Sequence, residues 1–226
     1  MRILKYFRTL SKFERTLWLC SIAVVSLSYL FARQGILNLC TSLIGVTALI
    51  FLAKGMLLGQ ALSIVFSLLY GIISYKFGYY GEMITYLFMT MPMAIISTVE
   101  WLKHPYKNSD IVEVSGVKKS QLAVMFLLCI LTTIIFFFLL KHLNTANLVF
   151  STISIATSFV AAYLTALRSP YFALAYAAND IVLIVLWTLA SIKDISFVPM
   201  IACFIMFLFN DLYGFFNWRR MQHLQK

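Results

Sequence analysis

Residues 61–103 read ALSIVFSLLYGIISYKFGYYGEMITYLFMTMPMAIISTVEWLK, and residues 178–220, 117 positions later, read ANDIVLIVLWTLASIKDISFVPMIACFIMFLFNDLYGFFNWRR. The two stretches align without a gap and share ten identities over 43 positions. Apolar runs coincide easily, so the matches of Lys76 with Lys193 and of Trp101 with Trp218 carry the most weight. An internal repeat in a membrane chain indicates two equivalent halves, and transporters usually bind their substrate between such halves.

The composition is that of a membrane protein. The chain is 62% hydrophobic and only 12% charged, whereas soluble proteins are roughly a quarter charged. Apolar runs predict eight spans in one transmembrane domain of residues 1–226, so the expected fold is an all-α polytopic membrane protein. The spans are 17–32, 36–53, 57–75, 79–101, 121–140, 144–166, 170–190 and 196–217. Crossing a bilayer takes about 20 residues, so the first two are short, and seven spans plus an interfacial N-terminal helix is the alternative.

Lysine and arginine placement predicts the orientation, because basic residues favour the cytoplasmic side. With eight spans and a cytoplasmic N-terminus, fourteen of the eighteen Lys and Arg residues lie in cytoplasmic segments. Both termini of this multi-pass protein are therefore expected in the cytoplasm, with the domain in the cell membrane. The net charge of +10 has the same explanation, together with attraction to anionic lipids.

The repeat divides the spans into two groups of three. We expect an extra N-terminal helix at 17–32, a first three-helix bundle at 36–101, a linker helix at 121–140 and a second bundle at 144–217. Four helices separate equivalent spans, an even number, so the two bundles should share one orientation in the membrane. Two parallel three-helix bundles joined by a linker resemble the plan of SWEET-type transporters, a likeness of fold that carries no information on substrate.

Polar side chains inside the seventh span are the first candidates for a substrate site, since ionisable groups within a bilayer are costly. Asp180 lies near the middle of this span, beside Asn179. Helical spacing puts Tyr176, Asp180 and Trp187 on one stripe, where an acid, a phenol and an indole can bind a polar ring. The alternative is that Asn179 and Asp180 hold the bundle together through hydrogen bonds between helices.

The eighth span adds further candidates. Asn210, Asp211, Tyr213, Asn217 and Trp218 follow one another within it. The 117-residue offset relates one helical face of the eighth span to a face of the fourth span. These two faces are expected to line the transport path. The faces carry Glu82, Tyr86, Met89, Met93, Ser97 and Glu100 in the first half, and Pro199, Cys203, Met206, Asn210, Gly214 and Asn217 in the second.

Four residues of the fourth span have expected roles at its ends or as a bend. Glu82 and Glu100 are possible gate residues; otherwise Glu82 is interfacial and Glu100 pairs with a basic neighbour. Trp101 is a possible gate, but together with Trp218 it is also typical of an interfacial membrane anchor. Pro92 is expected to kink the helix.

Other functional classes find little support. The four cysteines form no C-x-x-C pair and share no metal-type spacing with a histidine, so no metal and no cofactor is predicted. No D-x-x-D, H-E-x-x-H or G-x-S-x-G motif occurs, which argues against an enzyme. Basic residues do not cluster with aromatic ones in a nucleic-acid motif, so no nucleic-acid partner is expected.

The chain resembles the bacterial PnuC family of transporters for nicotinamide riboside and related compounds. The resemblance rests on Tyr80-Gly81-Glu82-Met83, Pro92-Met93 and Trp101-Leu102-Lys103 in the first half, and on the runs from Asn179 to Trp187 and from Asn210 to Met221 with Pro199-Met200 in the second. It covers about residues 36–221, and the second-half pattern is the more specific.

The resemblance implies a homotrimer in the lipid bilayer that takes up an unphosphorylated, vitamin-type nucleoside by facilitated diffusion. In that family a cytoplasmic kinase traps the nucleoside, so the transporter needs no ATP motif. Substrate-binding positions of the family carry over to Asn179, Trp187, Asn210 and Tyr213, and also to Asn217 and Trp218.

One departure bears on the cargo. Many relatives read Pro-Met-Gln where this chain has Pro92-Met93-Ala94, so an amide that suits a carboxamide is missing at Ala94. Nicotinamide riboside is the first expectation for the cargo. The alternatives are thiamine, riboflavin or a deoxyribonucleoside, and transport coupled to protons through Asp180 or Asp211.

Overall fold

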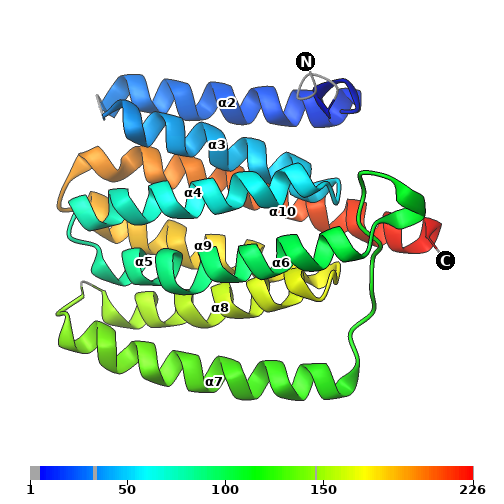
Figure 1. The fold of residues 1–226 in the computed structure, drawn as a ribbon. Coiled ribbons are helices and arrows are strands. Elements are labelled where there is room, and N and C mark those ends of the chain that lie inside the picture. Colours follow the sequence, from blue (N-terminus) through cyan, green and yellow to red (C-terminus); the bar gives the residue numbers. More distant parts are fainter. Residues whose placement is uncertain (1–5, 33–34, 146, 226) are drawn as a thin grey trace.

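The computed structural model describes residues 6–32, 35–145 and 147–225, which form a bundle of long, roughly parallel helices (Figure 1). Eight segments are long and apolar enough to cross a membrane, which confirms the predicted number of spans. The helices are α2 (Lys12–Ala32), α3 (Ile36–Ala53), α4 (Leu57–Lys76), α5 (Tyr80–Thr85), η1 (Tyr86–Thr90), α6 (Met91–Lys103), η2 (Tyr106–Asn108), α7 (Lys119–His142), α8 (Leu148–Ala166), α9 (Tyr171–Ser191), η3 (Ile195–Phe197) and α10 (Val198–Leu224).

Helix boundaries differ from the predicted spans where capping decides the helix end. Helix α2 begins at Lys12 and is 21 residues long, so the prediction of a short first span starting at residue 17 is wrong. The Ser11 hydroxyl accepts a hydrogen bond from the Glu14 amide, and the Glu14 carboxylate accepts one from the Ser11 amide. This reciprocal capping satisfies free amides of the first turn. At the other end of the chain, α10 continues to Leu224, well past the predicted residue 217.

The six helices of the repeat pack in a closed ring. Within the first half α4 packs against α3 and α6, and within the second half α9 packs against α8 and α10. Across the halves, α3 packs against α10 and α6 against α8. Helix α2 lies against α3 and α10, and α7 lies against α8 (Figure 1). The first helix of each half thus meets the last helix of the other, an arrangement that favours the two-bundle division, which itself stays a prediction.

The fourth span is interrupted by a π-helical segment. Residues 86–90 form η1 between α5 and α6, and Pro92 follows in the first turn of α6. Proline has no amide hydrogen to donate to the preceding turn, and π segments in helices occur frequently at functional sites. The fourth span thus has a wider turn just before the proline, and the kink at Pro92 stays a prediction.

Both ends of the described chain lie at the same end of the bundle, called here the terminal end (Figure 1). The connector of residues 104–118 crosses this end. Its Val112 amide donates to the Gly55 carbonyl at 2.9 Å, and its Ser115 amide donates to the Arg168 carbonyl at 3.0 Å. The connector is thus tied to the α3–α4 turn of one half and to the α8–α9 turn of the other.

Gly59 allows α4 to pack closely against α3. A Cβ atom at Gly59 would lie 2.4 Å from the Leu52 backbone nitrogen and 2.9 Å from the Ala48 carbonyl oxygen. Backbone atoms of a packed helix cannot move aside individually, so the two helices would have to separate. At Gly214 the nearest atom to an added Cβ is the Ala53 Cβ at 3.5 Å, an ordinary contact.

Gly59→Ala is therefore expected to lower the free energy of unfolding by about 1–3 kcal/mol, the usual cost of overpacking. Gly214→Ala is the matched control and should leave stability nearly unchanged. Thermal unfolding of the purified proteins in detergent measures both. Equal melting temperatures for Gly59→Ala and the unsubstituted protein would show that α3 and α4 are not held at this distance.

Candidate functional site

A cavity of about 70 Å³ lies inside the helix ring, between the two halves. Helices α3, α4 and η1 line it from the first half, and α8, α9 and α10 from the second. This volume holds a few water molecules but is below the roughly 300–1,000 Å³ of typical ligand pockets, so a larger ligand requires it to widen. Its lining residues are Gly45, Ala48, Leu49, Leu52, Ser63, Phe66, Ser67, Tyr86, Thr90, Ser158, Tyr176, Asn179, Asp180, Phe204, Phe207 and Asp211.

The central cavity has an acidic wall. Asp180 and Asp211, which are 3% and 5% exposed, both line it from neighbouring helices of the second half. Oδ2 of Asp180 is buried and, apart from the Asp211 carboxyl group, has no hydrogen-bond partner. None of the lining residues is a lysine, arginine or histidine, so the two carboxyl groups alone determine the charge of the wall.

Asn179 is fixed by a set of hydroxyl groups on α8. Its side-chain oxygen accepts hydrogen bonds from Ser154 at 3.2 Å, Thr157 at 2.8 Å and Ser158 at 3.0 Å. Inside a membrane such contacts tie helices together, which is the alternative role weighed from the sequence. Asn179 also lines the cavity, so one side chain both joins α8 to α9 and borders the space where a ligand would bind.

Aromatic rings form much of the remaining wall. The Phe66 ring lies 6.0 Å from that of Tyr86 and 5.5 Å from that of Phe207, between ring centroids. Phe204 and Phe207 pack edge to face at 5.4 Å. Tyr176 reaches the cavity from α9, as the sequence stripe predicts. These rings offer faces on which a planar ligand ring can stack.

Trp187, the third member of the stripe, lies away from the cavity. It is buried towards the end of the bundle opposite the termini, with its ring 4.9 Å from Tyr79 and 5.4 Å from Phe197. The indole nitrogen of Trp187 and the Tyr70 hydroxyl lie near each other, and neither has another hydrogen-bond partner. The carboxyl group of Glu82 in the same region is 2% exposed, and its Oε2 also lacks a partner. Glu82 is in the first turn of α5, at one end of its span, and it faces the protein interior.

Two of the predicted binding residues on α10 face α2 instead of the cavity. The Asn210 amide donates to the Ser21 hydroxyl at 3.1 Å and to a carbonyl of its own helix. The Tyr213 hydroxyl donates to Glu14 at 2.8 Å, and Glu14 forms a 3.0 Å ion pair with Lys54. These side chains anchor the extra N-terminal helix to the ring.

At the terminal end, three side chains donate hydrogen bonds to carbonyl groups in the last turns of other helices: Asn217, Trp218 and Trp101. The Asn217 amide donates to the Ala53 carbonyl at 2.8 Å, and the Trp218 indole donates to the Leu52 carbonyl at 2.8 Å. The first bond satisfies the Ala53 carbonyl in the last turn of α3, and the second adds a donor to the Leu52 carbonyl, which also accepts from the Gly55 amide at 2.8 Å. Both tryptophans are buried, so the prediction that they are membrane anchors is wrong.

The two tryptophans act reciprocally. Trp101 of the first half donates to the Thr165 carbonyl at 3.0 Å, in the last turn of α8, while Trp218 of the second half binds the last turn of α3. Their rings lie 5.3 Å apart. Each half thus donates a hydrogen bond to a helix end of the other half. The tryptophan pair lies between the cavity and the terminal surface.

Glu100 lies at the surface beside the tryptophan pair. Its carboxylate pairs with Lys103 at 3.2 Å and is 3.8 Å from His104, as the sequence alternative of a basic partner predicts. The Lys103 and Glu100 side chains are 61% and 36% exposed, so this pair contributes little to stability. Glu100 does not line the central cavity.

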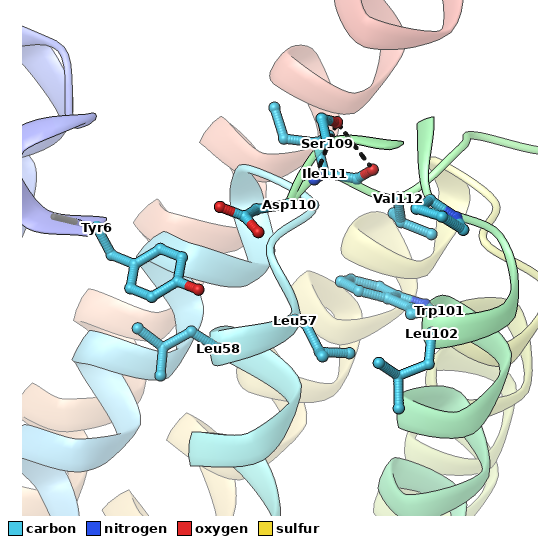
Figure 2. A pocket seen from close by; sticks show the side chains of 11 residues that line it. Tyr6, Leu57, Leu58, Trp101, Leu102, Ser109, Asp110, Ile111 and Val112 are labelled. Atoms are coloured by element: carbon cyan, nitrogen blue, oxygen red, sulfur yellow. Dashed lines mark hydrogen bonds between the residues drawn. The ribbon is translucent and has the colours of Figure 1, made fainter. Parts of the chain in front are cut away.

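A larger hollow of about 150 Å³ opens at the terminal end (Figure 2). Tyr6, Leu57 and Leu58 border it on one side and the connector residues Ser109–Val112 on another. It lies outside the helix ring, and its only charged lining residue, Asp110, is exposed. We therefore place the candidate site in the smaller central cavity, where polar residues from both halves meet.

Sequence reasoning missed several lining residues. Ser63, Thr90 and Ser158 are small polar residues that hydropathy does not distinguish from their neighbours, and Phe66 reads as ordinary apolar sequence. The repeat offers a signal for one of them, since the 117-residue offset relates Ser63 to Asp180. Both line the cavity.

Thr157→Val is expected to destabilise the α8–α9 pair, because it removes the shortest of the three bonds to Asn179. Interhelical hydrogen bonds of this kind contribute about 0.6–1.7 kcal/mol. Thr152→Val is the matched control on the same helix, since Thr152 donates only to the Leu148 carbonyl of its own turn. Equal melting temperatures of the two variants in detergent would show that the bond to Asn179 contributes nothing.

Comparisons with known proteins agree with this architecture. The chain is 25% identical over 215 residues to the nicotinamide riboside transporter PnuC of Neisseria mucosa, covering 92% of this chain and 81% of the relative. The crystal structure of a vitamin B3 transporter PnuC superposes with a TM-score of 0.82 at 22% identity, covering 96% of this chain and 94% of that one. Residues 35–220 match the nicotinamide mononucleotide transporter family. The chain belongs to this family and is a membrane transporter, not an enzyme.

Proposed function

We propose that the protein carries an unphosphorylated, vitamin-type nucleoside across the cell membrane through the central cavity, with nicotinamide riboside as the first candidate cargo. The observation that carries this proposal is the cavity between the two halves, which combines aromatic rings with polar groups of Asn179 and Asp180. Stacking on aromatic side chains contributes about 1–3 kcal/mol per base. The relative from Neisseria mucosa bears the name of a nicotinamide riboside transporter, which supports the same cargo.

The charge of the cavity favours a nucleoside over a nucleotide. The family description names a mononucleotide, whose phosphate is an anion at neutral pH. Phosphate sites in proteins use Arg, Lys or free amide groups, whereas the charged residues that line this cavity are Asp180 and Asp211. A phosphate beside these carboxyl groups would be repelled.

Transport would proceed by facilitated diffusion, with alternate opening of the two ends of the ring. The reciprocal bonds of Trp101 and Trp218 close the terminal end and constitute the gate in this proposal. We place both termini in the cytoplasm, in agreement with the distribution of basic residues. A cytoplasmic kinase that phosphorylates the cargo would prevent its return, and a homotrimer in the bilayer is the proposed assembly.

A second candidate is proton-coupled transport. Its basis is that Asp180 and Asp211 are neighbours inside the membrane, where paired acids can relay protons. Uptake that collapses with a protonophore would favour this candidate, and uptake that is indifferent to a pH gradient would exclude it.

Proteoliposomes preloaded with unlabelled nicotinamide riboside are expected to accumulate the radiolabelled compound without ATP or an ion gradient. Nicotinamide mononucleotide should not compete, because its phosphate would face the acidic wall. Unlabelled thiamine, riboflavin and deoxyribonucleosides test the alternative cargoes that Ala94 leaves open. No accumulation by folded protein would overturn the first-choice cargo.

The double variant Trp101→Phe and Trp218→Phe is expected to open the terminal end more often. It keeps an aromatic six-membered ring at each position but shortens the side chain and removes two hydrogen bonds of the closed form, each worth about 1 kcal/mol. In a background free of native cysteines, a cysteine at Ser67 reports opening through its labelling by a membrane-impermeant maleimide applied at that end. We expect labelling to be several-fold faster.

Trp18→Phe is the matched control for this measurement. The Trp18 indole donates to Thr47 at 3.1 Å, a bond between α2 and α3 that does not join the two halves. If both variants label at the rate of the parent protein, the tryptophan pair is not the gate.

A further inference from the structure

We propose that Asp180 and Asp211 together form the counter-ion for a positively charged aromatic ring in the cargo, so that the protein selects cationic heteroaromatic compounds over neutral nucleosides. This inference rests on the proposed function and specifies the chemical class of its substrate. Nicotinamide riboside belongs to that class because the ring nitrogen bonded to ribose carries a permanent positive charge. Thiamine, with its thiazolium ring, belongs to it as well, whereas riboflavin and the deoxyribonucleosides do not.

The geometry places both acids where a ligand would lie. Asp180 on α9 and Asp211 on α10 line the same cavity and are close enough to interact with each other. Oδ2 of Asp180 is more than nine-tenths buried and, apart from the neighbouring Asp211 carboxyl group, has no hydrogen-bond partner. A buried polar atom without a partner is rare in folded proteins and calls for a water, an ion or a ligand.

No protein cation neutralises this pair within the described residues. The ion pairs there are Lys54 with Glu14, Lys103 with Glu100 and His104 with Glu100. None of these residues lines the cavity, although the chain as a whole carries a charge of +10. The only charged side chains that line the cavity are therefore acids, and the missing positive charge must be supplied from outside the protein.

The pair matches a ligand with one positive charge. Two adjacent carboxyl groups in a low-dielectric interior do not both ionise, so the pair offers at most one negative charge. An unpaired buried charge is strongly unfavourable, and a monovalent cation in the cavity would compensate it. The rings of Phe66, Tyr86, Phe204 and Phe207 add faces that attract a cation, and they suit a flat ring better than a hydrated metal ion.

A purely structural role for the acids is disfavoured by the repeat. The 117-residue offset relates Asp180 to Ser63 and Asp211 to Ala94. The first half therefore packs its equivalent helices with a hydroxyl and a methyl group at these two positions. Since that half forms the same kind of bundle without either carboxylate, packing does not account for the acids.

The test compares two competitors that differ in charge. Nicotinamide riboside and its 1,4-dihydro form share the ribose and the carboxamide, but the dihydro ring is neutral. In counterflow with the unsubstituted protein, the cation should compete at a concentration about tenfold or more below that of the neutral form, a preference equivalent to at least 1.4 kcal/mol. Equal competition would overturn the proposal without any variant.

Variants then show which residues cause the preference for the cation. The double variant Asp180→Asn and Asp211→Asn should lose the preference for the cation, whereas each single variant should keep most of it because the remaining carboxyl group still ionises. Asp194→Asn is the matched control. Asp194 is exposed between α9 and α10, and hydrogen bonds from the Ser196 amide and hydroxyl hold the pKa of its carboxyl below the usual value. This variant removes a charge outside the cavity and should behave as the parent.

Failure of the proposed cargo and failure of the counter-ion are distinguishable. If folded protein does not transport nicotinamide riboside, the shift in melting temperature caused by thiamine is compared with that caused by riboflavin. Stabilisation by thiamine alone supports the counter-ion, and stabilisation by riboflavin alone or by neither compound overturns it. The counter-ion proposal is also overturned if the double variant keeps the parent's preference for the cation. It is overturned as well if the unsubstituted protein loses this preference when sodium is left out of the assay.

Discussion

Helix ends inside this bundle must find partners for their last carbonyl groups, because a membrane interior offers no water to them. The structure meets this requirement across the two halves. Asn217 and Trp218 supply donors to the end of α3, and Trp101 supplies one to the end of α8. The same bonds that satisfy the backbone also set the distance between the halves, so the cavity enclosed by the ring depends on them.

The polar groups of the ring divide into satisfied and unsatisfied sets with different consequences. Asn179 and Tyr213 have their side-chain bonds within the protein, and these bonds position helices. Glu82 instead keeps a buried oxygen atom without a partner, and Asp180 has only the Asp211 carboxyl group beside its Oδ2. Such atoms are unfavourable for folding, so packing alone does not explain why these acids are buried.

The sequence was sufficient for the number of spans, because hydropathy determines it. It also singled out Asp180 and Asp211, which line the cavity, because charge is rare in a membrane. It was insufficient for side-chain direction on α10. Asn210 and Tyr213 flank the cavity-lining residue Asp211, but their side chains bind residues of α2. This side-chain direction depends on the packing of the extra helix. In the sequence, Trp101 and Trp218 each lie beside a basic residue, as interfacial lipid anchors do. This pattern does not reveal that both side chains are buried.

The acidic wall of the cavity has a consequence for the orientation of whatever passes through it. A ring built from two equivalent halves would, by symmetry alone, accept a molecule equally well either way round. The second half has carboxyl groups at Asp180 and Asp211, whereas the first half has Ser63 and Ala94 at the equivalent positions. This difference makes the two orientations of the molecule unequal. Under the proposed function, a cargo with one charged face keeps a single orientation about the ring axis while the ends open and close, and the sequence difference between the halves determines that orientation.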